Sequence, residues 1–226
     1  NYRTAIFNFY LNKLILCYLF NEHGQGLQNA ELAKLYLDGV TGNIVVPVYY
    51  FYDSMVRLAV YVDADKSQQD ALLKQVTENQ IKMQQWAHHA PMNFLHKFYL
   101  VEAERQRILK ENVEAMENYD RAISIAKQNE YIHEEALANE LAAKFYQAWG
   151  KEKIASVYMN DARYCYTLWG SQAKVQDLSE RYPELLVSFR VDAITNSHTI
   201  TTMISTSSTS SEIIDLGAVM KASHAI

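Results

Sequence analysis

The chain has 226 residues, of which 49% are hydrophobic and 21% charged, so it is long and apolar enough to bury a continuous core. Its formal net charge is -5, with acidic and basic residues interspersed. Because no basic stripe is available to neutralise phosphates, we expect no nucleic-acid partner. The two cysteines, Cys17 and Cys165, lie among apolar residues, which favours free thiols and a reducing, cytoplasmic location.

The most apolar window is AIFNFYLNKLILCYLF, residues 5–20. It contains Asn8, Asn12 and Lys13, and it is shorter than the roughly 20 residues that cross a bilayer. We therefore expect a buried helix and no membrane segment. No basic leader or small-residue cleavage site flanks it, which argues against a signal peptide. The chain starts at Asn1 already inside this helical pattern, so we expect it to be a piece of a longer protein.

The sequence predicts an all-α fold, because it has only seven glycines and three prolines and is dominated by residues that favour helices. Breaks in the apolar pattern fall at 21–26, 38–43, 63–67, 88–93, 110–112, 127–131 and Gly150. The segments between these breaks have the length of ordinary helices. They predict four stacked helical hairpins, followed by a shorter helix at 172–181 that stops before Pro183.

Several residues indicate where individual helices begin and end. Ser67 is expected to cap the helix that follows it, with Asp70 near the positive end of that helix. Pro91 lacks an amide proton and should mark a turn. Gly150 can adopt the left-handed conformation that closes a helix. The GQG at 24–26 lacks the third glycine of a nucleotide-binding loop, so we interpret it as a turn.

An internal repeat connects two stretches in the second half of the chain. Ala115, Tyr119 and Ala122 recur 40 residues later as Ala155, Met159 and Ala162. Small residues at this spacing let two helices approach closely, while the larger residue fills the space beside them. These positions therefore predict the packing contacts of stacked helix pairs.

The search for chemistry predicts no catalytic residue, no metal site and no cofactor. Phosphate-binding and kinase motifs are missing. His88 and His89 are adjacent, so a helix would point them apart, and His224 is interpreted as a solvated helix residue. Five glutamates alternate with Arg and Lys, and we interpret them as solvated helix faces: Glu102, Glu104, Glu134, Glu135 and Glu140. We expect this fragment not to be an enzyme.

The sixteen tyrosines give the candidate partner surface, which comprises Tyr49, Tyr50 and Tyr52 in VYYFYD. Tyrosine combines a large apolar face with a hydroxyl that stays hydrated, as a peptide-binding groove requires. The alternative is that these side chains fill the space between stacked helices. A small-molecule pocket lined by the same tyrosines, or by Trp149 and Trp169, is a further alternative.

Three stretches of the chain carry a family resemblance: ANELAAKFYQAWGKEKIASVYMNDARYCYTLWGSQAKVQDLSERYPELL, FYLNKLILCYLF with the later YLDGVTG, and ISTSSTSSEIIDL. They resemble the helical-repeat region of the very large cyanobacterial-type multi-sensor kinases. Proteins of this family join an N-terminal serine/threonine kinase, a STAND-like AAA ATPase, a tetratricopeptide-like region, a GAF sensor and a C-terminal histidine kinase. The likeness extends over nearly all of this chain.

The resemblance implies a tetratricopeptide-like α-solenoid of about four helix pairs at 1–186. A Ser/Thr-rich linker would follow at 187–209, and 210–226 would start a signalling helix leading into a sensor domain outside this chain. The implied function is a non-catalytic scaffold that relays signals between ATPase, sensor and histidine kinase modules through protein–protein contacts. ATP binding and kinase activity would lie elsewhere in the parent protein. A small-molecule-sensing repeat domain is the alternative.

Overall fold

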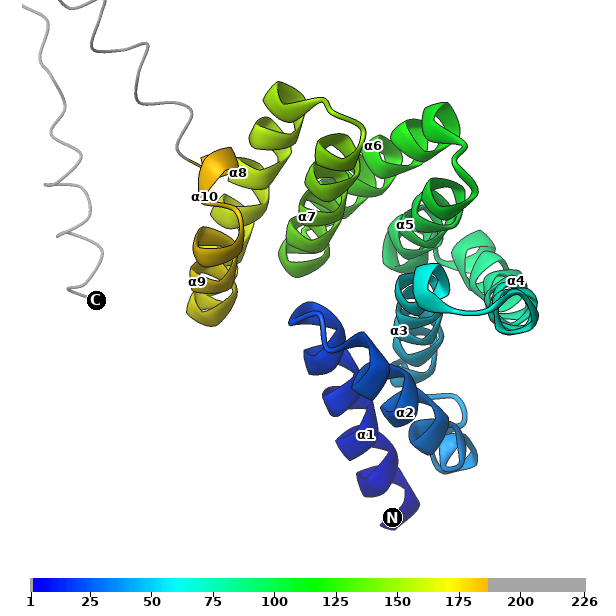
Figure 1. Ribbon diagram of the computed structural model, residues 1–226. Coiled ribbons are helices and arrows are strands. Elements are labelled where there is room, and N and C mark those ends of the chain that lie inside the picture. The colour runs from blue at the N-terminus through cyan, green and yellow to red at the C-terminus, as the bar shows by residue number, and fades with distance from the viewer. Residues whose placement is uncertain (1, 187–226) are drawn as a thin grey trace, which may run out of the picture. The chain divides into compact units, whose positions relative to one another are not determined.

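The computed structural model describes residues 2–186, which form an all-α solenoid of helical hairpins, as predicted (Figure 1). The α-helices are α1 (Tyr2–Leu19), α2 (His23–Lys34), α3 (Val45–Val60), α4 (Lys66–His89), α5 (Pro91–Leu109), α6 (Asn112–Gln128), α7 (Ile132–Ala148), α8 (Glu152–Trp169), α9 (Gln172–Arg181) and α10 (Pro183–Leu186). Two 3-10 turns flank α3, at Leu37–Val40 and Tyr61–Asp63. The predicted linker and signalling helix, and with them His224, lie outside the described residues.

The helices pack in consecutive pairs. α1 packs on α2, α3 on α4, α5 on α6 and α7 on α8, which confirms the four predicted hairpins. Further contacts of α2 with α3, α4 with α5 and α6 with α7 join each hairpin to the next, and α9 packs on α8. Figure 1 shows the hairpins following one another along an arc that brings α9 back toward the end of α1. The solenoid therefore has a concave side enclosed by its own chain.

Asp65, and not the predicted Ser67, caps α4. Its carboxylate accepts a hydrogen bond from the Gln68 amide at 2.9 Å, and the Gln68 side chain accepts one from the Asp65 amide at 3.2 Å. This reciprocal arrangement satisfies two amides that the first turn leaves without helical partners. The predicted turn at Pro91 is confirmed, since α5 begins there. Gly150 has the expected positive φ, 74°.

We expect Asp65→Ala to lower the free energy of unfolding by about 1 kcal/mol, because the capping box is lost. Ser67→Ala, two residues further on, should change it by less than about 0.5 kcal/mol. Urea unfolding followed by circular dichroism measures both values. Equal effects of the two substitutions would contradict the assigned cap.

Residues 24–26 are helical, so the turn predicted there is wrong. The chain reverses at Asn21, whose φ is 65°, and α2 begins at His23. Gly26 is buried, and a Cβ at this position would lie 2.9 Å from Val56 Cγ2 and 3.5 Å from Cys17 Cβ. The absence of a side chain lets α2 approach both α1 and α3 closely.

The six residues of the internal repeat all lie in the core. On α6 they are Ala115, Tyr119 and Ala122, and on α8 they are Ala155, Met159 and Ala162; none is more than 1% exposed. Both sets therefore occupy buried positions on the second helix of a hairpin, where α6 packs on α5 and α8 packs on α7.

The apolar window at 5–20 lies mostly within α1, which buries Phe7, Leu11 and Leu14 and exposes Phe9 and Leu16. Among the described helices, none combines the length and the apolar character that a membrane crossing needs. Both cysteines are free thiols.

Candidate functional site

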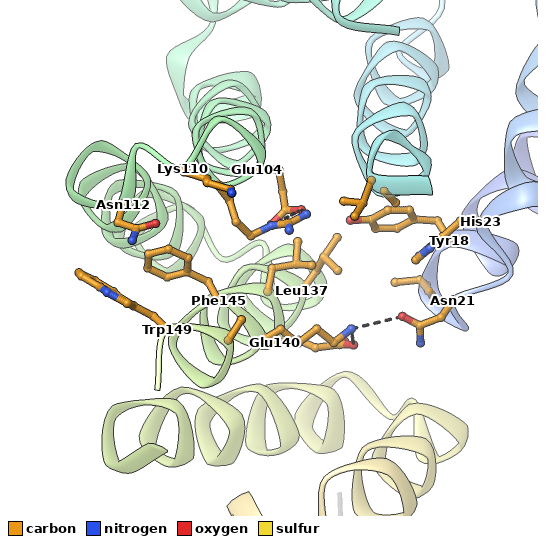
Figure 2. Close-up of a pocket in the computed structure, with 17 residues that line it drawn as sticks. Tyr18, Asn21, His23, Glu104, Lys110, Asn112, Leu137, Glu140, Phe145 and Trp149 are labelled. Carbon is orange, nitrogen blue, oxygen red and sulfur yellow. Dashed lines mark hydrogen bonds and ion pairs between the residues drawn. The ribbon is translucent and has the colours of Figure 1, made fainter. Parts of the chain in front are cut away.

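The candidate site is a cavity of about 490 Å³ on the concave side of the solenoid (Figure 2). Its lining comes mainly from the first helices of successive hairpins: Tyr18 and Leu19 from α1; Ala59 from α3; Glu104 and Arg107 from α5; Leu137, Glu140, Leu141, Lys144, Phe145 and Ala148 from α7. Connecting segments and the first residues of α2 and α6 add Asn21, His23, Val62, Lys110, Asn112 and Trp149. A volume of this size is typical of small-molecule sites.

One wall of the cavity carries a carboxylate paired with a guanidinium. Arg107 Nε lies 3.1 Å from both oxygens of Glu104, and Arg107 Nη2 donates to Glu104 Oε2 at 2.7 Å. The buried hydroxyl of Tyr119 donates to Glu104 Oε1 from behind. The negative charge of Glu104 raises the pKa of Arg107 above its ordinary value, so the guanidinium stays charged.

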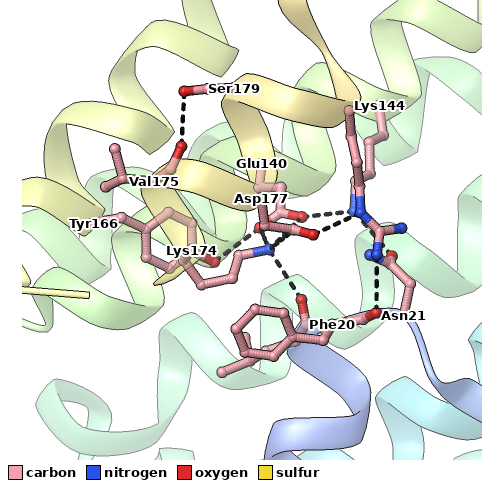
Figure 3. Close-up of polar contacts among 11 residues, drawn as sticks. Phe20, Asn21, Glu140, Lys144, Tyr166, Lys174, Val175, Asp177 and Ser179 are labelled. Carbon is pink, nitrogen blue, oxygen red and sulfur yellow. Dashed lines mark hydrogen bonds and ion pairs between the residues drawn. The ribbon is translucent and has the colours of Figure 1, made fainter. Parts of the chain in front are cut away.

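A second carboxylate, Glu140, is held by two lysines and a tyrosine (Figure 3). Lys144 Nζ donates to Glu140 Oε1 at 2.7 Å, and Lys174 Nζ lies 3.1 Å from Oε1 and 3.0 Å from Oε2. The Tyr166 hydroxyl donates to Oε2 at 2.9 Å. Burial raises the pKa of Glu140, but the charges of Lys144 and Lys174 outweigh it and lower the pKa to about 2.

The depressed pKa of Glu140 gives a testable pH dependence. Below pH 4.5 the carboxyl binds a proton in the unfolded chain, whereas in the folded chain it stays ionised down to about pH 2. Stability from this group is therefore present above pH 4.5 and is lost as the pH falls through that window. We expect the free energy of unfolding to fall more steeply there in the wild type than in Glu140→Gln, as urea unfolding at several pH values would measure.

The same cluster joins the two ends of the solenoid through three side chains, which we call the clasp: Lys144, Lys174 and Arg181. Lys174 Nζ donates to the Leu19 carbonyl at 2.9 Å, and Arg181 Nη2 to the Phe20 carbonyl at 3.3 Å. Lys144 Nζ lies 3.4 Å from Asn21 Oδ1. The Leu19 and Phe20 carbonyls are at the C-terminal end of α1, where carbonyls lack helical partners and the helix dipole favours cations. Asn21 Oδ1 belongs to the turn that follows. The clasp therefore closes the solenoid on itself.

Glu104, Glu134 and Glu140 are buried, so their interpretation as solvated helix faces is wrong. Glu134 lies outside the cavity, where its Oε2 is 2.6 Å from His96 Nε2 and accepts a hydrogen bond from Lys97 Nζ at 2.9 Å. Burial raises its pKa, but hydrogen bonds from His133 and His96 and the charge of Lys97 outweigh this and hold the pKa well below its ordinary value. Each glutamate is paired with a basic side chain, which offsets the free-energy cost of burying the charge of the carboxylate.

The tyrosines proposed as a partner surface lie elsewhere, on α3. Tyr49 and Tyr52 are only 1% and 5% exposed, and the Tyr49 hydroxyl donates to the Ala30 carbonyl at 3.2 Å. Tyr50 is half-buried and its hydroxyl accepts a hydrogen bond from Lys82 at 2.7 Å. Two of the three rings are therefore unavailable to a partner, because the contact with neighbouring helices covers them. The packing alternative describes Tyr49 and Tyr52 correctly.

The two tryptophans of the alternative pocket are separated. Trp149 lines the cavity, is 38% exposed and has its ring centroid 5.5 Å from that of Phe145. Trp169 is not part of the lining; it stacks on His133 with ring centroids 5.3 Å apart. Sequence reasoning thus found one lining residue and missed the charged groups. The sequence pattern that could have revealed these charged groups is the spacing of about one helical turn between Glu104 and Arg107 and between Glu140 and Lys144. Ion pairs on exposed helices show the same spacing.

Comparison with known proteins gives a local match. Over 63 residues, 28% of the chain, the sequence is 38% identical to hybrid signal transduction histidine kinase G of Dictyostelium discoideum. The matched stretch is 2% of that protein's length, so this chain is similar to a small part of it. No model of a known protein family matches the sequence. No solved structure matches the chain.

Proposed function

We propose that this chain is a non-catalytic scaffold and relay module of a signal-transduction protein, acting through protein–protein contacts. The observation that carries the proposal is the clasp, because it connects the end of α1 and the turn after it directly to α7 and α9. In an open solenoid each hairpin contacts only its neighbours, so a disturbance fades with distance. In this closed arrangement a displacement of α1 acts directly on α9, without passing through the hairpins between them.

The local similarity to a histidine kinase supports a signalling context. The resemblance to the tetratricopeptide-like region of multi-sensor kinases extends the proposal: the module would couple an ATPase to sensor and histidine kinase domains. Exposed apolar side chains on α1 and α8 favour contacts with other proteins: Tyr2, Phe9, Leu16, Ile154, Val157, Tyr164 and Leu168.

The relay is tested by hydrogen exchange in a double-mutant cycle. Leu14→Ala removes a fully buried side chain from α1, and Lys174→Met removes the clasp ammonium while keeping most of the side-chain volume. We expect Leu14→Ala alone to reduce amide protection in α9, and to have no such effect when Lys174→Met is already present. If Leu14→Ala alters only α2 and α3, the two ends are not coupled and the relay proposal fails.

A second candidate function is the sensing of a small molecule, favoured by the cavity itself. The cavity has an apolar wall, charged groups and a partly exposed indole from Trp149, the combination that ligand sites use. Quenching or enhancement of tryptophan fluorescence by a bound compound, and its loss in Trp149→Leu, would support this function. Trp169→Leu is the matched control, since Trp169 lies outside the cavity.

A further inference from the structure

We propose that the cavity binds a small organic anion that carries a planar aromatic ring, with its anionic group held by Arg107 and Lys110 and its ring against Trp149. The inference rests on the second candidate function, and it names the class of ligand. The class of ligand follows from the polar atoms of the lining. Some already make hydrogen bonds within the protein, and others face the open cavity.

The carboxylates of the lining have their acceptor capacity engaged from the wall. Glu104 accepts hydrogen bonds from Arg107 and Tyr119, and Glu140 accepts from Lys144, Lys174 and Tyr166. Their side chains are only 5% and 3% exposed. A cationic ligand would find no open carboxylate in this cavity, so the site disfavours cations.

The cationic partners are more exposed than the carboxylates that they contact. Arg107 and Lys144 side chains are 30% and 25% exposed. A guanidinium has five N–H groups and an ammonium three, so both retain donors beyond those used in the ion pairs. Each pair therefore places its negative end in the wall and its positive end toward the cavity.

Lys110 adds a charge that no carboxylate neutralises. Lys110 is exposed and lines the cavity. Among the described residues, its ammonium has neither a hydrogen-bond nor an ion-pair partner. Within residues 2–186, the lining thus has three cations, Arg107, Lys110 and Lys144, and two carboxylates, Glu104 and Glu140. His23 adds little positive charge, because burial and the charge of Lys144 lower its pKa. A chain of net charge -5 therefore has a cavity with a positive surplus.

The aromatic part of the ligand is inferred from one end of the cavity. Figure 2 places Trp149, Phe145 and Asn112 at this end, with Lys110 nearby, and Asn21 and His23 at the opposite end. An aromatic ring gains most from packing against an exposed indole. The neighbouring Lys110 ammonium would bind the anionic group of the same molecule through a charge-assisted hydrogen bond.

The test compares two probes of similar ring structure with the full chain: 1-anilinonaphthalene-8-sulfonate, an aromatic anion, and the uncharged N-phenyl-1-naphthylamine. Dissociation constants come from probe fluorescence. We expect Lys110→Gln to weaken binding of the anion about tenfold and to leave the uncharged probe unchanged. Lys127→Gln, at an exposed lysine outside the cavity, is the matched control and should change neither constant. Trp149→Leu should weaken both probes.

The outcomes distinguish the preference for an anion from small-molecule binding in the cavity as such. If both probes bind and Lys110→Gln has the same effect on each, or no effect, the anion preference is overturned while small-molecule binding stands. If neither probe binds, or if Trp149→Leu changes neither constant, the cavity is not the binding site and the second candidate function fails as well. Thermal unfolding of every variant, followed by circular dichroism, confirms that the probes report on folded protein.

Discussion

Glu140→Gln is expected to lower the free energy of unfolding by about 3–5 kcal/mol, the range for removing one member of a buried ion pair. The substitution keeps the size of the side chain and removes its charge. Among the residues that the structure describes, Lys174 Nζ, whose side chain is 1% exposed, would keep only Asp177 as a counter-charge, and Lys144 would lose its acceptor at 2.7 Å. Chemical denaturation with urea measures the change.

Glu117→Gln is the control for this loss. Glu117 pairs with Arg121 at 3.5 Å, but both side chains are more than half exposed. Water therefore screens that pair, and its removal should change the free energy of unfolding by less than about 0.5 kcal/mol. Comparable losses for the two variants would show that the Glu140 cluster is not the buried junction described above.

Tyr119→Ala is expected to destabilise the fold by about 3–5 kcal/mol, as removal of large buried aromatic side chains does. Tyr119 is fully buried, its ring centroid lies 5.3 Å from that of Phe145, and its hydroxyl donates to Glu104. The variant would leave a cavity in the core and remove one donor from a buried carboxylate. Thermal and urea unfolding both report the loss.

The internal repeat provides a second variant that tests the same packing contact, and an exposed tyrosine provides the control. Met159, the counterpart of Tyr119 one repeat later, is also fully buried, so Met159→Ala should cost about 2–5 kcal/mol. Tyr164→Ala removes a side chain that is 64% exposed on the same helix as Met159, and should change stability by less than about 0.5 kcal/mol. A small effect at Tyr119 would mean that the aromatic residue of the repeat is not a packing contact.

The fold could be predicted from the sequence because its signals are local. Pro91 starts α5, Gly150 follows α7 with a positive φ, and α9 has the predicted bounds at Gln172–Arg181. The structure differs from the prediction where two conformations share the same local sequence pattern. A glycine can mark a turn or a close helix contact, and Gly26 is the latter because Val56 lies against it.

The site could not be predicted because its charged residues are brought together by distant segments. The spacing of Glu140 and Lys144 is that of any exposed ion pair on a helix, and Lys174 joins them only through tertiary structure. Nothing in VYYFYD distinguishes a ring that faces a neighbouring helix from one that faces solvent, so the sequence leaves both alternatives open, and Tyr49 and Tyr52 are buried. Burial, which decides both cases, is a property of the assembled solenoid.

The clasp also fixes the number of hairpins. An open array can gain or lose a repeat during evolution, because each unit needs only its neighbours. Here an additional hairpin between α2 and α7 would carry Lys174 away from the Leu19 carbonyl, which it now meets at 2.9 Å across 155 positions of sequence. Insertions or deletions of whole repeats would therefore open the structure, so variation in length should be confined to the turns on its outer surface.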